Sequence, residues 1–591
     1  MTPQDFYKNA IDNCQNQIKE LKKRSAWTAF ARLVVFTATA VCAFSIDCAG
    51  IVTFLMVAVG LTIFLFLTKI SSRISNAIDI EKAKQKWVRQ NIDRMNLNLS
   101  KLPTGEQFAE PNHDFASDID IFGKSSLFTL LNSTSTKGGE KLLADWLQHP
   151  ERISNNVVER QNAIQELTEK CDFRLNFAAT GEIAKSDKKA KSEEIPSFKL
   201  NLLQKIAIYA LPLIFLTMCV LSALDMVSGN AVFWTFFIIL GLASLQAKRV
   251  GFLHEQISAI GADIARSSEI FKTIENAEFN SAILKDLQRQ IHTEQGKASV
   301  FSKQLSRYIN NLDQRYNVFG YIIMNGLFIW DWRQLNNIDK WLSKHQDHIE
   351  EWKSAIANYD ALCALASFSF NFPQFNYPTY EADSEYIVEA VNAGHPMIQA
   401  DRCVRNDIKL LKEKSFFIIT GANMAGKSTY LRTVAVNYLL AEIGAPVFAD
   451  SMKFTPTHLY TGLRVADSLN DGASYFFAEL KRLETMVKRA ESGEKMLVIL
   501  DEILRGTNSI DKQKGSLGLI KKLIHLPVGG IIATHDLAVG TLADAFPDKV
   551  QNFRFEAETN DDELTFSYHL QPGVAQNTNA FFLMKKMGII D

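Results

Sequence analysis

The chain contains four long apolar stretches, arranged as two pairs. They cover residues 27–46, 48–68, 206–224 and 226–247. Asp47 separates the members of the first pair, and Asp225 separates those of the second. The first stretch carries one charged residue, Arg32, and the other three carry none. Since a helix needs about 20 apolar residues to cross a bilayer, this pattern predicts two transmembrane helical hairpins.

Basic residues flank both pairs on their outer sides. Lys22, Lys23 and Arg24 precede the first pair, and Lys248 and Arg249 follow the second. Cytoplasmic loops carry an excess of lysine and arginine, so we expect both hairpins to begin and end in the cytoplasm. This predicts a multi-pass protein of the cell inner membrane with cytoplasmic soluble domains and the lipid bilayer as a partner. The alternative is that the four stretches are buried core helices.

The soluble regions differ in their hydrophobic periodicity. Between residues 118 and 368, outside the second pair of stretches, apolar residues recur at helical spacing. The aromatic run at residues 318–330 is too short to cross a bilayer, so we expect it in the core of this helical region. From residue 383 onward, strand-like runs alternate with helical segments.

Three short apolar runs in this last region end at polar residues. They are residues 416–420, 496–500 and 530–534. Such runs are typical of buried parallel strands in an α/β domain, whose active site lies at the carboxyl ends of the strands.

Residues 421–428, directly after the first of these runs, match the pattern G-x-x-x-x-G-K-[ST]. In a P-loop of this kind the backbone N–H groups surround the phosphates, the lysine reaches the β and γ phosphates, and the hydroxyl binds Mg²⁺. The motif predicts ATP and Mg²⁺ binding, with Ser428 as a metal ligand; the alternative is a chance glycine-rich turn. The expected nucleotide-binding residues are Gly421, Ala422, Asn423, Met424, Ala425, Gly426, Lys427, Ser428 and Thr429.

Acidic residues and a histidine follow the other two runs. Asp501 and Glu502 come directly after residues 496–500. A P-loop ATPase needs one acid there for Mg²⁺ and one carboxylate for the attacking water, so we assign Asp501 to the metal and Glu502 as general base. His535 follows residues 530–534 and is placed to sense the γ-phosphate. The plainer interpretations are an N-cap pair of acids and a structural histidine.

Five segments resemble the successive ATPase motifs of the MutS family of DNA mismatch repair proteins. They are residues 421–432, 441–449, 467–479, 501–508 and 533–536. The resemblance implies that Ser474 is presented to the nucleotide of a partner subunit, and hence a homodimer through the ATPase domain. It also places Tyr568 near the second position that stacks on adenine, whereas the family's other stacking aromatic, before the P-loop, is replaced near Cys403. DNA is the partner that the resemblance implies.

The N-terminal region departs from that family. The first hairpin lies where the family has its mismatch-reading domain, and Phe108 of a Phe-x-Glu pattern lies in a turn-rich linker. A wedge residue needs a folded domain to hold it against DNA, so we expect no mismatch wedge. The formal net charge of −1 gives no general support for nucleic-acid binding, and the seven cysteines form no C-x-x-C pair that would indicate zinc.

The expected fold class is mixed: transmembrane helical hairpins, an all-α core and lever domain, and an α/β P-loop ATPase domain of the ABC type. Alternatives from other classes are an ABC-type transporter ATPase and a membrane scaffold without catalysis. The expected organisation is a cytoplasmic N-terminal helix (1–26), hairpin 1 (27–68), a helical segment and linker (69–117), the first part of the MutS-like core (118–199), hairpin 2 (200–247), core and lever helices (248–382) and the ATPase domain (383–591).

Overall fold

The computed structural model contains two compact units, one almost entirely helical and one of mixed helix and sheet. It describes residues 2–45, 50–185, 200–293, 296–382, 384–411, 416–422, 425–463, 475–504, 507–560, 563–576 and 589–590. Unit 1 consists of Met1–Arg89, Thr134–Glu140 and Cys171–Asp360. Unit 2 consists of Gln90–Ser133, Lys141–Lys170 and Ala361–Asp591.

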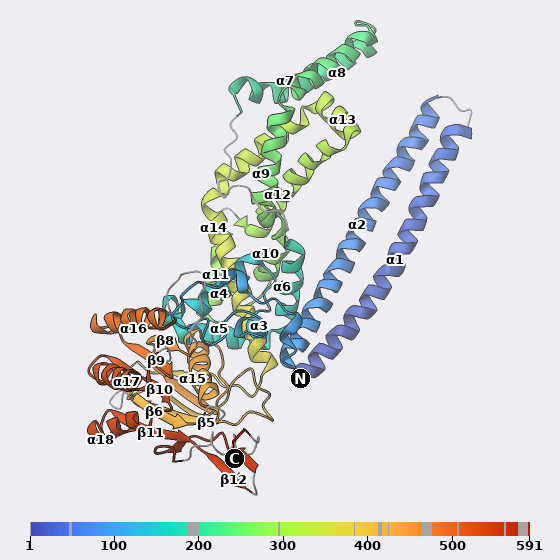
Figure 1. Ribbon diagram of the computed structural model, residues 1–591. Helices are drawn as coiled ribbons and strands as arrows, with labels where there is room; N and C mark the ends of the chain where they lie inside the picture. The colour runs from blue at the N-terminus through green and yellow to red at the C-terminus, as the bar shows by residue number, and fades with distance from the viewer. Residues whose placement is uncertain are drawn as a thin grey trace. The chain divides into compact units, whose positions relative to one another are not determined.

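Unit 1 is built almost entirely from helices (Figure 1). They are α1 (Pro3–Ser45), α2 (Gly50–Met95), α6 (Cys171–Ala184), α7 (Leu202–Ala223), α8 (Gly229–Ser244), α9 (Ala247–Arg266), α10 (Ser268–Glu275), α11 (Ala282–Gln290), α12 (Ala298–Asp313), the short helix η5 (Gln314–Tyr316), α13 (Val318–Phe328) and α14 (Trp330–Asn371). A two-stranded ribbon, β1 (His292–Thr293) and β2 (Gly296–Lys297), joins α11 to α12. The prediction of a helical region is confirmed for the described residues.

Several of the described helices are candidates for membrane spans. α1, α2 and α7 are long and apolar enough to cross a bilayer. α8 and the first part of α9, which meet at a bend of 54°, would together form a fourth span. α1 continues without a break from the polar first residues into the first apolar stretch. Asp225 lies between α7 and α8 with a φ of 56°, while Asp47 falls outside the described residues.

The expectation that residues 318–330 lie in the core is wrong for α13. Val318 and Phe319 at its start and Ile323 and Phe328 further along are exposed. The helix also packs against α8 of the same unit. An apolar run of this length has the same sequence pattern whether it fills a core or faces lipid, so sequence alone could not separate the two.

A six-stranded sheet forms the centre of unit 2. Its order is β14-β11-β6-β10-β9-β8, where all strands but β14 are parallel. The strands are β6 (Phe416–Gly421), β8 (His458–Gly462), β9 (Met496–Asp501), β10 (Val528–Thr534), β11 (Val550–Phe555) and β14 (Gln571–Pro572). The three predicted strands lie in β6, β9 and β10, so their parallel pairing is confirmed.

Helices cover both faces of this sheet (Figure 1). α15 (Lys427–Glu442) contacts β6, β9 and β10 on one face, and α16 (Tyr475–Glu491), α17 (Ser509–Leu523) and α18 (Leu542–Ala545) cover the other. Side chains alternate along a strand, so Ile418, Val498 and Ile532 share one buried cluster with Met486 of α16 and Leu523 of α17. This arrangement places the carboxyl ends of β6, β9 and β10 side by side.

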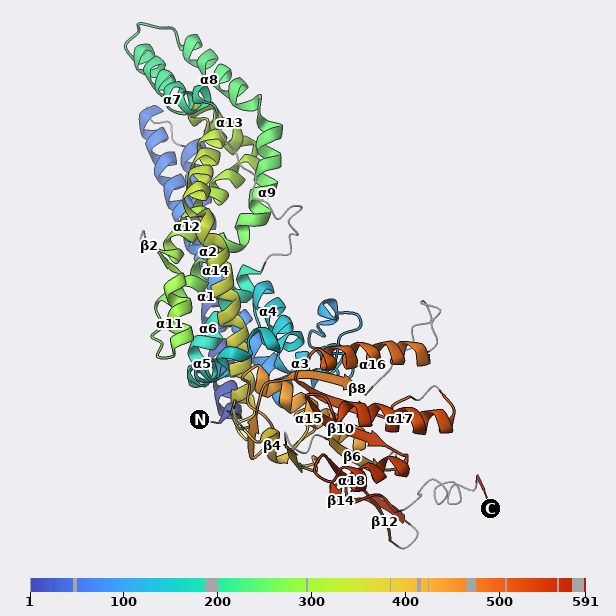
Figure 2. The same cartoon turned by 90° about the vertical axis from the view of Figure 1, so that its left-hand side faces the viewer.

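Smaller elements complete unit 2 (Figure 2). A second sheet has the order β3-β7-β4-β5, and β12 pairs with β13 as a hairpin. These strands are β3 (Thr379–Tyr380), β4 (Tyr386–Ala393), β5 (Asn406–Leu411), β7 (Ser451–Phe454), β12 (Ala557–Asn560) and β13 (Glu563–Phe566). The remaining α-helices are α3 (Leu127–Leu131), α4 (Lys137–Gln148) and α5 (Val157–Glu169). The helices α2, α4 and α14 each cross the unit boundary.

Candidate functional site

The glycine-rich segment, residues 421–428, connects β6 to α15. Gly421 has a φ of 146°, and a Cβ there would lie 2.5 Å from the carbonyl oxygen of Phe555. Gly426 has a φ of 99°, and its Cβ would lie 3.0 Å from the ring of Tyr568. Both positions therefore require glycine, as a loop that curls tightly before a helix does. Asn423 and Met424 lie outside the described residues.

Lys427 occupies the first turn of α15 and is only 2% exposed. Its Nζ donates hydrogen bonds to the carbonyl oxygens of Gly421 at 2.7 Å and Ala422 at 2.9 Å. A buried ammonium group needs such partners. The lysine is thus held inside the curve of the segment, where it could exchange loop carbonyls for a more strongly negative ligand.

Ser428 and Asp501 connect the start of α15 with the end of β9. The Ser428 hydroxyl donates a 2.6 Å hydrogen bond to Oδ2 of Asp501. Asp501 is buried, whereas Ser428 lines an open cavity. A hydroxyl and a carboxylate are oxygen ligands of the kind that Mg²⁺ prefers, so the pair fits the predicted metal site.

Glu502 and His535 form a second pair, between the ends of β9 and β10. His535 Nε2 lies 2.6 Å from Oε1 of Glu502. Glu502 has a φ of 51°, an uncommon value for a residue other than glycine. Strain of this kind is frequent at functional sites, although it identifies no role by itself.

A cavity of about 400 Å³ lies beside the glycine-rich segment. Its walls include Gly426, Ser428, Thr429 and Tyr568 of the predicted set, together with Cys403. Sequence reasoning assigned no role to His395 or Arg402, which also line it. Burial, then the charge of Arg432, lowers the pKa of His395 to about 4, so this side chain is neutral near pH 7. The volume fits a nucleoside-sized ligand.

Glu479, on α16, was also missed. Its Oε1 accepts a 2.7 Å hydrogen bond from the backbone N–H of Leu504, two residues after Glu502. Its buried Oε2 has no hydrogen-bond partner among the described residues. A cavity of about 20 Å³, lined by Glu479, Asp501 and Glu502, adjoins it and is large enough for one water. Ser474, the predicted trans-acting serine, lies outside the described residues just before α16.

Three aspartates of one segment of unit 2 contact the elements around the site. They are Asp114, Asp118 and Asp120, and they contact β8, α16 and α15. Asp114 pairs with His458 of β8 at 2.7 Å and with Arg489 of α16 at 2.5 Å. Asp118 accepts a 2.7 Å hydrogen bond from Thr461, also of β8. Asp120 lies 3.1 Å from Arg432, which follows the glycine-rich segment by one turn of α15.

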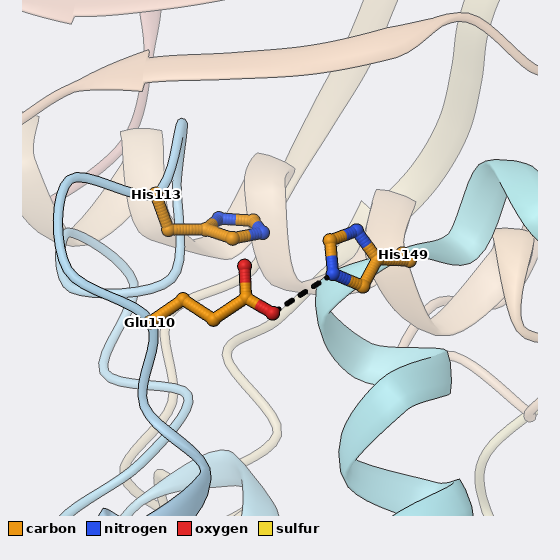
Figure 3. Close-up of side chains that lie close together, drawn as sticks. All are labelled: Glu110, His113 and His149. Atoms are coloured by element: carbon orange, nitrogen blue, oxygen red, sulfur yellow. Dashed lines mark hydrogen bonds and ion pairs between the residues drawn. The ribbon is translucent and has the colours of Figure 1, made fainter.

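Glu110, His113 and His149 form a separate cluster (Figure 3). Their ligand atoms lie within 4.8 Å of one another, a spacing that a metal ion could use. However, His113 Nε2 lies 3.0 Å from the Gln148 carbonyl oxygen, and its Nδ1 accepts from backbone N–H groups at 3.2 and 3.3 Å. These contacts fix the tautomer with the proton on Nε2, so that nitrogen offers no lone pair to a metal. The cluster fits a hydrogen-bonded structural element better than a metal site.

Comparison with known proteins agrees with the motifs. The family model of MutS domain III matches residues 94–366, and that of MutS domain V matches residues 417–589. The DNA mismatch repair protein MutS of Lactobacillus helveticus is 30% identical over 257 residues, which are 42% of this chain and 29% of the relative. Its namesake from Thermotoga maritima is 31% identical over 254 residues, 42% of this chain and 31% of the relative.

The matched stretch covers less than a third of the length of these curated relatives. The domain V match, residues 417–589, includes the glycine-rich segment, the acidic pair and the histidine. The chain belongs to the MutS family.

Proposed function

We propose that this chain is a membrane-anchored, Mg²⁺-dependent ATPase with a P-loop ATPase domain. One observation carries the proposal: Lys427 and Ser428, Asp501 and Glu502, and His535 converge from three strand ends of one sheet. Positive charge, metal ligands and a carboxylate for water are the parts that phosphoryl transfer requires. The cavity beside them has room for the nucleoside.

Each residue then has a distinct task. The backbone N–H groups of the glycine-rich segment and Lys427 would hold the phosphates, and Ser428 and Asp501 would hold Mg²⁺, which would supply positive charge beside the phosphate oxygens. Glu502 accepts the proton of the attacking water, and His535 orients that carboxylate through their 2.6 Å contact. Tyr568 and Arg402 line the cavity where the base and ribose would lie.

The relatives are named as DNA mismatch repair proteins, so we propose DNA as the macromolecular partner. The proposed assembly is a homodimer in which Ser474 of each chain serves the nucleotide of the other, and ATP drives movement of the helical levers. Phe108 packs against Phe128 with ring centroids 5.9 Å apart, which supports the view that it is no mismatch wedge. The membrane anchor would consist of α1 with α2 and of α7 with α8, with the soluble parts in the cytoplasm.

Nucleotide binding and hydrolysis in purified full-length protein test the ATPase proposal. Lys427→Ala should weaken ATP binding, whereas Glu502→Ala should retain binding and lower turnover by about 10²- to 10⁴-fold. Asp548→Asn, at an exposed acid remote from the site, serves as the control. Normal turnover in Glu502→Ala would show that Glu502 is not the general base.

DNA binding over a salt series tests the partner. Contacts to phosphates release counterions, so affinity should fall steeply as salt rises. Matched and G·T-mismatched duplexes should bind within about tenfold of each other, because no wedge is available. Binding that is absent at low salt would reject DNA as the partner and leave the ATPase proposal standing.

A further inference from the structure

α13 is an apolar helix with several exposed large side chains. The eleven residues Val318–Phe328 include no charged side chain. Val318, Phe319, Ile323 and Phe328 are 69%, 79%, 48% and 40% exposed. Large apolar side chains of soluble proteins are mostly buried, and a contiguous exposed group of them marks an interaction surface.

α13 also packs against α8, with close contacts further along the helix. The hydroxyl of Tyr321 lies 3.1 Å from that of Ser244 on α8. Gly326 meets the ring of Phe236, where a Cβ would come within 2.3 Å. The glycine thus permits a close approach of the two helices. α13 therefore extends the exposed apolar surface of the α7–α8 hairpin, on which Leu213 of α7 also lies.

The segments just before and just after α13 contact each other. Arg315, just before the helix, lies 3.8 Å from Asp331, just after it. The indole N–H of Trp330 donates a 2.9 Å hydrogen bond to the carbonyl oxygen of Asn311. Eleven helical residues are about 16 Å long, about half the hydrocarbon thickness. Such a helix cannot span a bilayer, but a segment whose two ends are tied together needs to reach into one leaflet only.

Basic residues gather where α13 joins the rest of unit 1. Arg315 is largely buried and donates a 2.8 Å hydrogen bond to the carbonyl oxygen of Ala247. Lys248 and Arg249 follow Ala247 in the first turn of α9 and are exposed. Positive charge beside an apolar surface complements the anionic headgroups of a cytoplasmic leaflet.

We propose that α13 is a re-entrant membrane helix. Its exposed apolar side chains, Val318, Phe319, Ile323 and Phe328, contact the acyl chains of the cytoplasmic leaflet beside the α7–α8 hairpin, and Lys248 and Arg249 at its base contact the headgroups. This inference rests on the proposed membrane anchor, since it needs α7 and α8 in the bilayer. It adds a third membrane-contacting element to the second hairpin and connects the bilayer directly to α12 and α14.

Thiol labelling of the full chain in vesicles that contain anionic lipid tests the inference. Separate variants carry Phe319→Cys, Ile323→Cys, Leu213→Cys on α7, or Arg307→Cys at an exposed position of α12. A water-soluble maleimide is supplied on both sides of the membrane, and peptide mass spectrometry measures each site separately from the native cysteines. Rates are divided by those of the same protein unfolded in detergent, which removes differences in intrinsic reactivity.

We expect Phe319→Cys, Ile323→Cys and Leu213→Cys to react at least tenfold more slowly than Arg307→Cys. Rapid labelling at residues 319 and 323 with slow labelling at 213 overturns the inference and leaves the anchor intact. Rapid labelling at 213 overturns the anchor and the inference with it. Oxidation to disulfide-linked dimers of Ile323→Cys would show that a second copy of the chain covers this face instead of lipid, and would also overturn the inference.

Discussion

The Ser428 hydroxyl donates a 2.6 Å hydrogen bond to Asp501, and this contact ties the start of α15 to the end of β9. If both residues bind Mg²⁺, Ser428→Ala should remove one oxygen ligand, and Asp501→Asn should remove the negative charge of another. We expect the Mg²⁺ concentration for half-maximal ATPase activity to rise at least tenfold in either variant, about 1.4 kcal/mol of binding free energy. Titration of activity with Mg²⁺ at saturating ATP measures the change.

The same titration with Asp548→Asn provides the control, because this exposed acid lies outside the site. Since Mn²⁺ accepts the same oxygen ligands, it should support activity in the parent chain and show a similar loss in both variants. An unchanged Mg²⁺ requirement in Asp501→Asn would mean that the pair is a structural contact between helix and strand.

The sequence was most informative where chemistry depends on a local pattern. Asp501 and His535 stand at the ends of apolar strands, and Lys427 follows another strand through the glycine-rich segment, so their place at the sheet edge could be predicted from hydrophobicity and spacing. Glu479 could not be found in this way, because its contact with Leu504 depends on how α16 packs over the sheet. α13 was misassigned for a related reason: an apolar segment specifies burial, but not whether protein or lipid provides it.

Glu479 should position the catalytic carboxylate rather than act on substrate. It accepts a hydrogen bond from the backbone of Leu504, which has a φ of 61° in the turn that also contains Glu502. Glu479→Ala would leave that buried N–H without its partner, a loss of about 1–3 kcal/mol. We expect kcat to fall about tenfold or more while ATP affinity stays near that of the parent chain.

Glu479→Gln separates positioning from general loss of structure, since the amide oxygen can still accept from Leu504. This variant should recover most of the turnover and show the same pH profile as the parent chain. If Glu479→Ala weakened ATP binding as much as it slowed turnover, a folding defect would explain it better than positioning.

Asp114 should make unit 2 sensitive to acid. Burial would raise the pKa of this carboxyl, but hydrogen bonds from His458 and Arg489 outweigh burial and lower the pKa to about 2. An unfolded aspartate has a pKa of about 3.9, so the unfolded chain binds more protons between these values. The stabilisation is complete above about pH 4 and is lost as the pH falls toward 2.

Thermal unfolding of detergent-solubilised protein between pH 5 and pH 3 measures this effect. Asp114→Asn should lower the melting temperature at pH 5, and the difference from the parent chain should shrink at pH 3. Asp548→Asn controls for the general effect of removing one carboxylate. A constant difference across this range would show that Asp114 acts through neutral hydrogen bonds only.

Asp360 joins α14 to the start of α4 within unit 1 by accepting hydrogen bonds from consecutive residues. The backbone N–H groups of Ser135 and Thr136 donate to it at 3.0 Å and 2.7 Å, and the Thr136 hydroxyl donates at 2.6 Å. Gly139 permits the approach, because a Cβ there would lie 2.4 Å from the carboxylate. Asp360→Ala should leave these buried donors without a partner, at a cost of about 1–3 kcal/mol each.

Hydrogen exchange at the amides of Ser135 and Thr136 reports this loss locally, which suits a chain of several units that need not unfold in one step. We expect protection there to fall at least tenfold in Asp360→Ala, while the amides of β9 in unit 2 stay unchanged.

Burial raises the pKa of Asp360 to about 6 despite these donors. The folded chain therefore binds the extra proton between about pH 4 and 6, so the contribution of Asp360 to stability falls as the pH rises through that window and is constant above it. In Asp360→Asn, which cannot titrate, the protection of the two amides should lose this pH dependence; protection that changed with pH in the same way as in the parent chain would assign the titration to another group.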